Sequence, residues 1–362
     1  MKRDVSVEFA RIIACLMVIG IHISLNICHD GYFDASRLGF ACIVADAVGV
    51  FWLILGFFLF LNTSYKKLIR KTIVNIGVPT LLFSIFAFYF GEWIAEGVPL
   101  NESILHSFQE YVDVLKELLK WNSPVKYGGH LWYIYVYMLI ILIYPVLKAT
   151  VDYLDEKVER QKIFMLMTMG AFLLNDISRN QLFQFSHHSI NALVLASVIV
   201  IWGNIIYKRK EDLVTKRNLL LSVLAFIGFN MMRTIFQLYF YHIEAGDNIL
   251  FWYSSIGVLC AACVVIFAFC VENVIVKIKH LGDIINFLAS HTFNIYLLHF
   301  MIIYVLRRIS FQDKLYNWMP NEILYMCILV IMVFTVSFLA SVGLRMFGNI
   351  CRKLINKGVH FL

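Results

Sequence analysis

The feature that most constrains the fold is a series of long apolar runs separated by short polar segments. They predict about ten helices, most of them near the roughly 20 residues that a helix needs to cross a bilayer. The chain is also 60% hydrophobic and only 15% charged, whereas soluble domains average about 45–50% and about 25%. The sequence therefore predicts a single all-α integral membrane domain over 1–362. We expect its transmembrane helices at about 8–27, 41–61, 74–91, 130–149, 163–175, 190–207, 218–240, 250–271, 287–306 and 323–345.

The 31 Lys and Arg residues are unevenly divided between the connections. Counted on alternate sides, 21 fall on the side that holds both termini and 8 on the other, while Arg11 and Arg233 lie within helices. Cytoplasmic loops of membrane proteins carry such an excess of positive charge. Both termini are therefore predicted to be cytoplasmic, and the net charge of +7 needs no nucleic-acid partner.

The longest connection, 92–129, is then extracytoplasmic. It carries apolar residues at the spacing of an amphipathic helix on the outer interface: Ile104, Phe108, Val112, Leu115 and Leu119. Its role stays open between a cover for the rim of the bundle and a gate or support for a substrate.

The first helix carries polar residues that are costly inside a membrane, namely Glu8, Arg11 and His22. A charged group at the bilayer centre costs at least ~2.5–3.5 kcal/mol, so such groups usually face a protein interior or a water-filled cavity. At about 100° per residue, Arg11 and His22 lie on one face of the helix, ~16 Å apart along its axis. Glu8 and Cys15 fall within about 60° of that face. The first helix is therefore predicted to present one polar stripe to the protein interior.

This stripe combines two chemical abilities. Arginine binds phosphate with two parallel hydrogen bonds, although Arg11 could also extend to the lipid headgroups on the cytoplasmic side. Histidine, with a pKa near 6.5, acts as base and then as acid at physiological pH. The pair indicates a long anionic cofactor that enters from the cytoplasm and brings its reactive end to a second substrate near His22.

Three other polar positions are candidates for the same site. His130 begins the fourth helix on the outer side, and His299 lies within the ninth; each is either part of the site or a structural hydrogen-bonding residue. Arg233 in the seventh helix pairs with Glu244 or Asp247, or it contacts an anionic acceptor. Most of the eight cysteines lie in apolar runs without metal-ligand spacing, which indicates small core residues and no metal site.

Motifs in three helices resemble the acyltransferase 3 family, membrane enzymes that acylate, most often O-acetylate, bacterial surface glycans. The first is Glu8-x-x-Arg11-x10-His22, which resembles the family's first-helix signature. The second is His-Leu-Trp-Tyr at 130–133 followed by Tyr-Pro-Val-Leu at 144–147, and the third is the run 290–299, which ends at His299. The similarity covers about 3–345. The sequence departs from the family pattern at Glu8, where Asp is commoner, and at 51–57, which lacks a Ser before the Gly.

The resemblance implies an O-acetyltransferase of the bacterial cytoplasmic (inner) membrane. The donor would be cytoplasmic acetyl-CoA, bound by Arg11 and Cys15 with Glu8 orienting the arginine. The acceptor would be a hydroxyl of an extracytoplasmic or lipid-linked glycan, with His22 as general base or as a carrier of the acetyl group. We assign acceptor binding to His130, Trp132, Arg233 and His299.

Two other classes of function compete with the enzyme. A transporter or exporter of glycans or small anions fits the helix number and the intramembrane charges, but it leaves the Arg11–His22 spacing unexplained. A non-catalytic scaffold of a glycan-assembly complex would tolerate the loss of both residues. Within the enzyme class, a succinyl or other short acyl donor, a homo-oligomer and a glycan-assembly partner all stay open.

Overall fold

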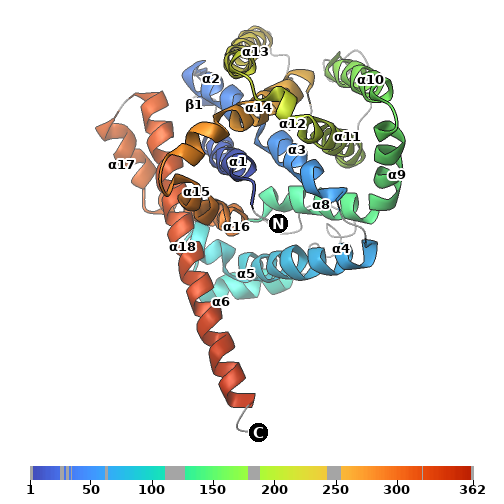
Figure 1. Cartoon of the computed structure of the whole chain (residues 1–362). Coiled ribbons are helices and arrows are strands. Elements are labelled where there is room, and N and C mark those ends of the chain that lie inside the picture. Colours follow the sequence, from blue (N-terminus) through green and yellow to red (C-terminus); the bar gives the residue numbers. More distant parts are fainter. Residues whose placement is uncertain are drawn as a thin grey trace.

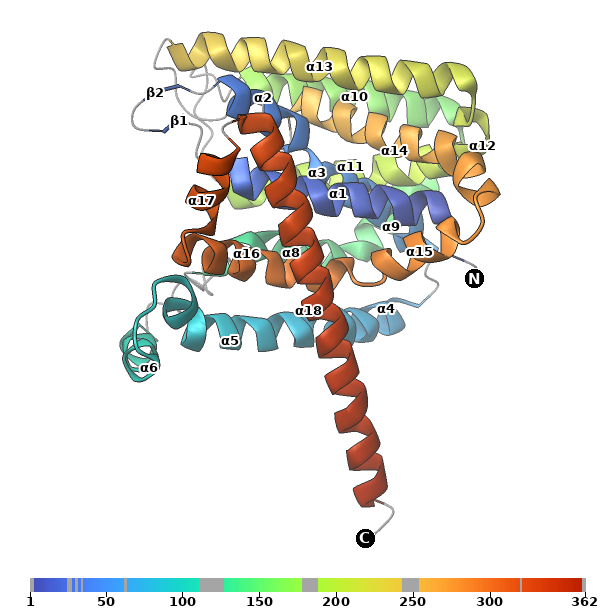
Figure 2. The same ribbon diagram turned by 90° about the vertical axis from the view of Figure 1, so that its left-hand side faces the viewer.

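The computed structural model describes residues 3–24, 28–29, 32–33, 35–61, 64–110, 127–177, 188–242, 254–319 and 321–359. Within these ranges the chain is helical apart from two short antiparallel strands, β1 (Cys28–His29) and β2 (Tyr32–Phe33). Most of the long helices run side by side, so that Figure 1 views many of them end-on and Figure 2 views them from the side. This confirms the all-α fold class.

Helix α1 (Val5–Ser24) lies at the centre of this bundle (Figure 1). Its side chains are buried on several faces, including Ala10, Ala14 and Ile19 at 0% exposure. A helix that is apolar nearly all round belongs in an interior, and its polar stripe then meets other helices and not lipid. The elements in contact with it are α2 (Ala35–Val44), α3 (Ala47–Leu59), α14 (Ser255–Lys277), α15 (Leu281–Ala289), α16 (Thr292–Arg308) and α18 (Glu322–Val359).

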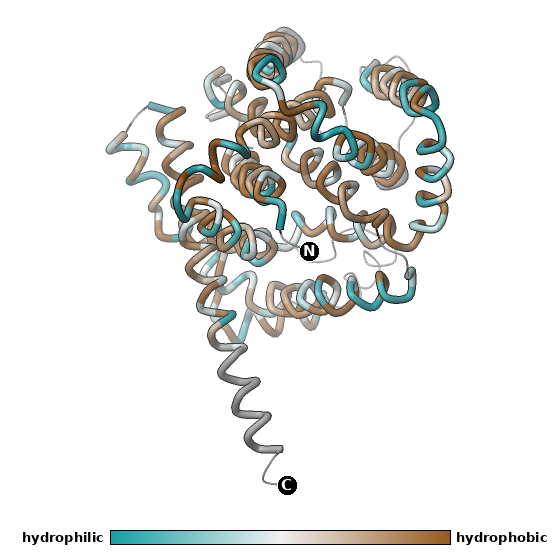
Figure 3. Tube along the Cα trace, in the orientation of Figure 1, coloured by the Kyte–Doolittle hydropathy of each residue, from teal (hydrophilic) through white to brown (hydrophobic). Residues whose placement is uncertain are grey.

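The remaining elements surround this centre. Along the chain they are α4 (Tyr65–Thr72), the π-helix η1 (Ile73–Gly77), α5 (Val78–Ala95), α6 (Leu100–Gln109), the 3₁₀ turn η2 (Gly129–Leu131), α8 (Trp132–Leu142), α9 (Tyr144–Asp155), α10 (Val158–Ile177), α11 (His188–Lys208), α12 (Lys210–Leu213), α13 (Lys216–His242) and α17 (Phe311–Trp318). Helices α5 and α13 lie at the periphery (Figure 1), and many of their residues are hydrophobic (Figure 3). Exposed side chains such as Leu81, Leu224 and Met231 are expected where the solvent is lipid.

Helices α3 and α11 pack closely because two glycines face the opposite backbone. A Cβ atom at Gly56 would lie 1.9 Å from the carbonyl oxygen of Val200, and one at Gly203 would lie 2.1 Å from that of Leu53. Small residues let membrane helices approach to backbone contact, where van der Waals packing holds them. This contact fixes α3, which also forms one wall of the cavity described below.

In the described ranges, six helical segments are long and apolar enough to cross a membrane, where consecutive helices such as those in Ala35–Leu59 count as one segment. The number rises to eight if each of two bent helix pairs is also one span. The first pair bends by 68° before α9, where Pro145 lies in the first turn, and the second by 61° between α15 and α16. The other two predicted segments, 163–175 and 190–207, are helical in α10 and α11 but do not pass as spans. A count of ten and the side of the termini therefore stay predictions.

Within 92–129 the structure describes one further helix, α6, and the predicted amphipathic helix on the outer interface stays a prediction. Ser103 and Ser107 face α5 and donate hydrogen bonds to the carbonyl oxygens of Tyr89 and Phe88, while Leu105 and Phe108 stay exposed. The apolar side is therefore free to meet an interface. The rest of the predicted helix, including Val112, Leu115 and Leu119, lies outside the described residues.

Candidate active site

Three histidines from distant parts of the sequence meet at one point. His22 comes from the last turn of α1, His130 from η2 and His299 from the middle of α16. The ring centroid of His299 lies 5.3 Å from that of His22 and 5.1 Å from that of His130, and the other two are 6.5 Å apart. The sequence singled out each histidine separately, and the fold brings them together in what we call the histidine cluster.

Hydrogen bonding determines which ring nitrogen of His299 carries a proton. Its Nδ1 lies 2.7 Å from the carbonyl oxygen of Tyr296, and a carbonyl oxygen can only accept, so Nδ1 carries the proton. The Nε2 of neutral His299 is then a hydrogen-bond acceptor. Within the described part of the chain, this Nε2 and the Nδ1 of His22 are buried without a protein partner. Leaving such groups unpaired costs about 1–3 kcal/mol each, which suits a site that a substrate completes.

Aromatic rings enclose the histidine cluster. The ring of Phe300 lies 4.8 Å from His22 and 4.9 Å from His130, and Phe83 and Tyr296 lie 5.8 Å and 5.4 Å from His130. The hydroxyl of Tyr296 also donates to the backbone carbonyl oxygen of His130, so α16 is tied to η2 at this point. Neither Tyr296 nor Phe300 was predicted as a site residue, although Tyr296 belongs to the motif at 290–299 and both lie within three residues of His299 in the chain.

A cavity of about 380 Å³ opens beside the polar stripe of α1. Arg11 lines it and is held by Glu8, with 2.8 Å between Nη1 of the arginine and Oε2 of the carboxylate. Arg3 also lines the cavity, and the rest of the wall is mostly apolar or aromatic. A second cavity of about 170 Å³ shares part of this wall and adds Lys71. The positive charge at one end suits an anion, and the apolar wall suits a flexible uncharged chain.

Neither Cys15 nor Trp132, both predicted to bind ligands, lines the cavity. Cys15 is buried in an apolar cluster with Ile19 and Ile295 and does not line the cavity, so we assign it a packing role. Trp132 is partly buried against the main apolar core, and its ring lies 6.5 Å from that of Tyr133.

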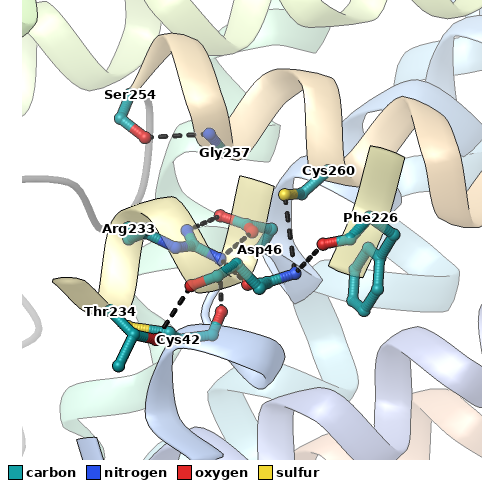
Figure 4. Close-up of polar contacts among 9 residues, drawn as sticks. Cys42, Asp46, Phe226, Arg233, Thr234, Ser254, Gly257 and Cys260 are labelled. Atoms are coloured by element: carbon teal, nitrogen blue, oxygen red, sulfur yellow. Dashed lines mark hydrogen bonds and ion pairs between the residues drawn. The ribbon is translucent and has the colours of Figure 1, made fainter. Parts of the chain in front are cut away.

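Arg233 pairs with a residue that the sequence analysis missed (Figure 4). Its Nη1 and Nη2 lie 2.9 Å and 2.7 Å from the two carboxylate oxygens of Asp46, and Nη2 also bonds to the carbonyl oxygen of Cys42 and to Asn230. Both side chains are buried, at 0% and 1% exposure. The expected partners, Glu244 and Asp247, lie outside the described residues. Because Asp46 occupies both terminal nitrogens, we now assign Arg233 a structural role and not acceptor binding.

One signal in the sequence could have identified this pair. Asp46 stands in the apolar run 41–61, where a lone carboxylate at membrane depth needs a cation as partner. Figure 4 also shows Gly257 near this pair, and a Cβ atom there would lie 2.6 Å from Oδ1 of Asp46. The glycine in α14 therefore makes room for the carboxylate.

The comparisons with known proteins agree with the motifs. The family model described as an acyltransferase domain (Acyl_transf_3) matches residues 4–342, nearly the whole chain. The chain belongs to the acyltransferase 3 family. This confirms the resemblance, and together with the apolar helices it supports a multi-pass membrane acyltransferase. No curated protein matches the chain, and no solved structure does. Within the described residues, no group of three or more His, Cys, Asp or Glu side chains is placed to hold a metal ion.

Proposed function

We propose that this membrane acyltransferase is an O-acetyltransferase that moves an acetyl group from cytoplasmic acetyl-CoA to a hydroxyl of an extracytoplasmic or lipid-linked surface glycan in the bacterial inner membrane. The observation that carries the proposal is the arrangement along α1. Arg11 lines a cavity at one end of the polar stripe, and His22 joins the histidine cluster at the other.

The cavity supports acetyl-CoA as donor on chemical grounds. Coenzyme A joins a phosphorylated nucleotide to a long, mostly uncharged arm that ends in the thioester. Arg3 and Arg11 suit the phosphates, and the apolar wall suits the arm. Among the described residues, Glu8 bonds to one nitrogen of the Arg11 guanidinium, and in this proposal the remaining donors of Arg11 bind the ligand.

His22 supplies the proton transfer. In the simplest step, a ring nitrogen of His22 takes the proton from the acceptor hydroxyl while that oxygen attacks the thioester carbonyl carbon. The new C–O bond forms, the C–S bond breaks, and His22 returns the proton to the departing thiolate. In the second route, a ring nitrogen of His22 attacks the thioester carbonyl carbon, the C–S bond breaks and coenzyme A leaves as the thiolate. The acceptor oxygen then takes the acetyl group as the N–C bond breaks, and its proton goes to the thiolate. His299, whose orientation is fixed by the Tyr296 carbonyl, lies with its ring 5.3 Å from that of His22, and in this proposal it contributes with His130 to the acceptor side.

The test is the His22→Ala variant, purified in detergent with a polysaccharide extract of the expressing cells as acceptor. Loss of a positioned base costs about 10²–10⁴-fold, so we expect thiol release from acetyl-CoA and acetyl incorporation to fall at least 100-fold. Trapping with labelled acetyl-CoA in the absence of acceptor separates the two routes, because only the carrier route leaves label on the protein. The control is an unchanged unfolding temperature.

An unchanged rate in folded His22→Ala would remove this residue from the mechanism. Glycan movement across vesicles without consumption of acetyl-CoA would instead support the transporter, the main alternative.

A further inference from the structure

Three of the aromatic rings that line the cavity, Phe51, Tyr133 and Tyr296, lie against one another, and we call them the aromatic floor. The ring of Tyr133 lies 6.0 Å from Phe51 and 5.9 Å from Tyr296, so the three form a continuous row. They come from α3, α8 and α16, and all three line the cavity.

Tyr296 links the aromatic floor to the histidine cluster. Tyr296 precedes His299 by one helical turn, and Tyr133 follows His130 by one turn. The Tyr296 ring lies 5.4 Å from His130 and 5.9 Å from His299, whereas none of the three histidines lines the cavity. Among the rings of the floor, Tyr296 therefore connects the cavity to the histidine cluster, and we expect an acyl group at the end of a donor to pass it on the way to His22.

Tyr296 is the most firmly fixed of the three. Its hydroxyl donates to the carbonyl oxygen of His130, which holds the ring across the path. Tyr133 packs with its centroid 4.2 Å from that of Trp52, a residue at 0% exposure, so it has little room to move aside. The free space near Tyr296 is set by rings that are themselves packed or hydrogen-bonded.

We infer that the aromatic floor, and Tyr296 above all, determines the length of acyl group that this protein transfers. The inference rests on the proposed function and adds its donor selectivity. A two-carbon group needs the smallest displacement of the Tyr296 ring, and each further methylene needs more. A close-fitting site discriminates by about 10–200-fold per methylene. The geometry thus favours acetyl over longer acyl groups, a choice that the sequence left open.

The experiment measures kcat/KM for acetyl-CoA, propionyl-CoA and butyryl-CoA in wild type and in Tyr296→Ala, with the same polysaccharide extract as acceptor. We expect the ratio of butyryl to acetyl to rise at least about tenfold in Tyr296→Ala, because the missing ring leaves room for additional methylenes. Tyr296→Phe keeps the ring and loses only the hydroxyl, so its ratio should stay within about threefold of wild type.

Tyr137→Ala is the matched control. Tyr137 lines the same cavity from α8 but lies one turn further from His130 than Tyr133 does. Its removal enlarges the cavity away from the aromatic floor, so the chain-length ratio should not change. An equal rise in this variant would assign the selectivity to the cavity as a whole and overturn the role of the floor.

Phe51→Leu covers the case in which Tyr296→Ala does not fold. It opens the same floor from α3, and we expect a shift toward butyryl in the same direction. Ratios unchanged from wild type in the folded variants would overturn the inference while acetyl transfer by wild type leaves the proposed function standing. A wild-type protein that transfers no acyl group from any of the three donors would defeat the proposed function itself.

Discussion

Arg11 and Arg233 are both arginines within apolar helices, yet the fold treats them differently. Arg233 is buried at 0% exposure and bonds to both carboxylate oxygens of Asp46. The Arg11 side chain is 28% exposed, shares one hydrogen bond with Glu8 and lines the cavity. A charge at membrane depth is costly in either case, but only one of the two is enclosed by its partners. The comparison indicates that an intramembrane arginine is a candidate for ligand binding when some of its guanidinium donors face a cavity. Its depth in the membrane alone does not distinguish the two cases.

The largest effect is expected on stability at Arg233. Arg233→Ala leaves the Asp46 carboxylate buried without its cation, and breaking a buried pair in this way costs about 3–5 kcal/mol. We expect a large drop in the unfolding temperature in detergent. The double variant Arg233→Met with Asp46→Leu removes both charges and should recover most of the loss.

This prediction can break the comparison. If Arg233→Ala unfolds at the same temperature as wild type and loses only acyl transfer, then Arg233 belongs to the site. The structural role assigned to it from its burial would then be wrong.

A smaller effect, on binding, is expected at Arg11. Hydrogen bonds to charged groups contribute about 1.5–3 kcal/mol, so Arg11→Ala should raise the KM for acetyl-CoA about 10–100-fold. The unfolding temperature should change little, because the side chain is partly exposed and the loss of an i, i+3 pair costs only about 0.2–0.5 kcal/mol.

Arg11→Lys is the informative companion variant. It keeps the charge and loses the planar two-pronged geometry, so its KM should lie between those of wild type and Arg11→Ala. A KM that does not change in Arg11→Ala would remove the residue from donor binding.

Much of the fold could be predicted because hydropathy is a local property. Each predicted apolar run overlaps at least one helix, and the stripe on α1 was recognised from helical geometry alone. The bends of 68° and 61° could not be predicted, because apolar residues continue on both sides of each break. The Pro145 in the first turn of α9 is the one local signal near the first bend.

The family resemblance predicted one site with His22, His130 and His299, but the residues alone left His130 and His299 open between a site role and a structural one. His22, His130 and His299 were each identified, but α1, η2 and α16 are separated by more than a hundred residues, and their contact depends on tertiary packing. The pairing of Asp46 with Arg233 was not predicted, because these residues are also far apart in the sequence. The predicted partners of Arg233, Glu244 and Asp247, follow its own helix in the chain, whereas Asp46 lies in the turn between α2 and α3 and meets α13 only in the folded bundle.

The smallest predicted effect concerns Asp4, a charge at the edge of the bundle, where water reaches it. Asp4 lies just before α1, accepts a hydrogen bond from the backbone N–H of Ser6 at 3.1 Å, and lies 2.7 Å from the Nζ of Lys210. Burial raises the pKa of Asp4, but hydrogen bonds from Lys210 and Ser6 outweigh it and hold the pKa below its ordinary value. The carboxylate therefore stabilises the folded state at pH values above about 3.9, and this contribution is lost as the pH falls below that value through the lower folded-state pKa.

Asp4→Ala should accordingly cost about 1 kcal/mol at pH 7, the usual cost of losing a helix N-cap, and the difference from wild type should shrink as the pH approaches 3. Asp4→Asn, which keeps a capping oxygen and loses the charge, should show the smaller loss. Denaturant unfolding in detergent at both pH values measures this. The side chains of Asp4 and Lys210 are 15% and 17% exposed, so solvent screens this pair in a way that it cannot screen Arg233 and Asp46. A loss at Asp4 as large as that at Arg233 would mean that burial does not set the energetic rank of these charges, and the contrast between Arg11 and Arg233 would lose its physical basis.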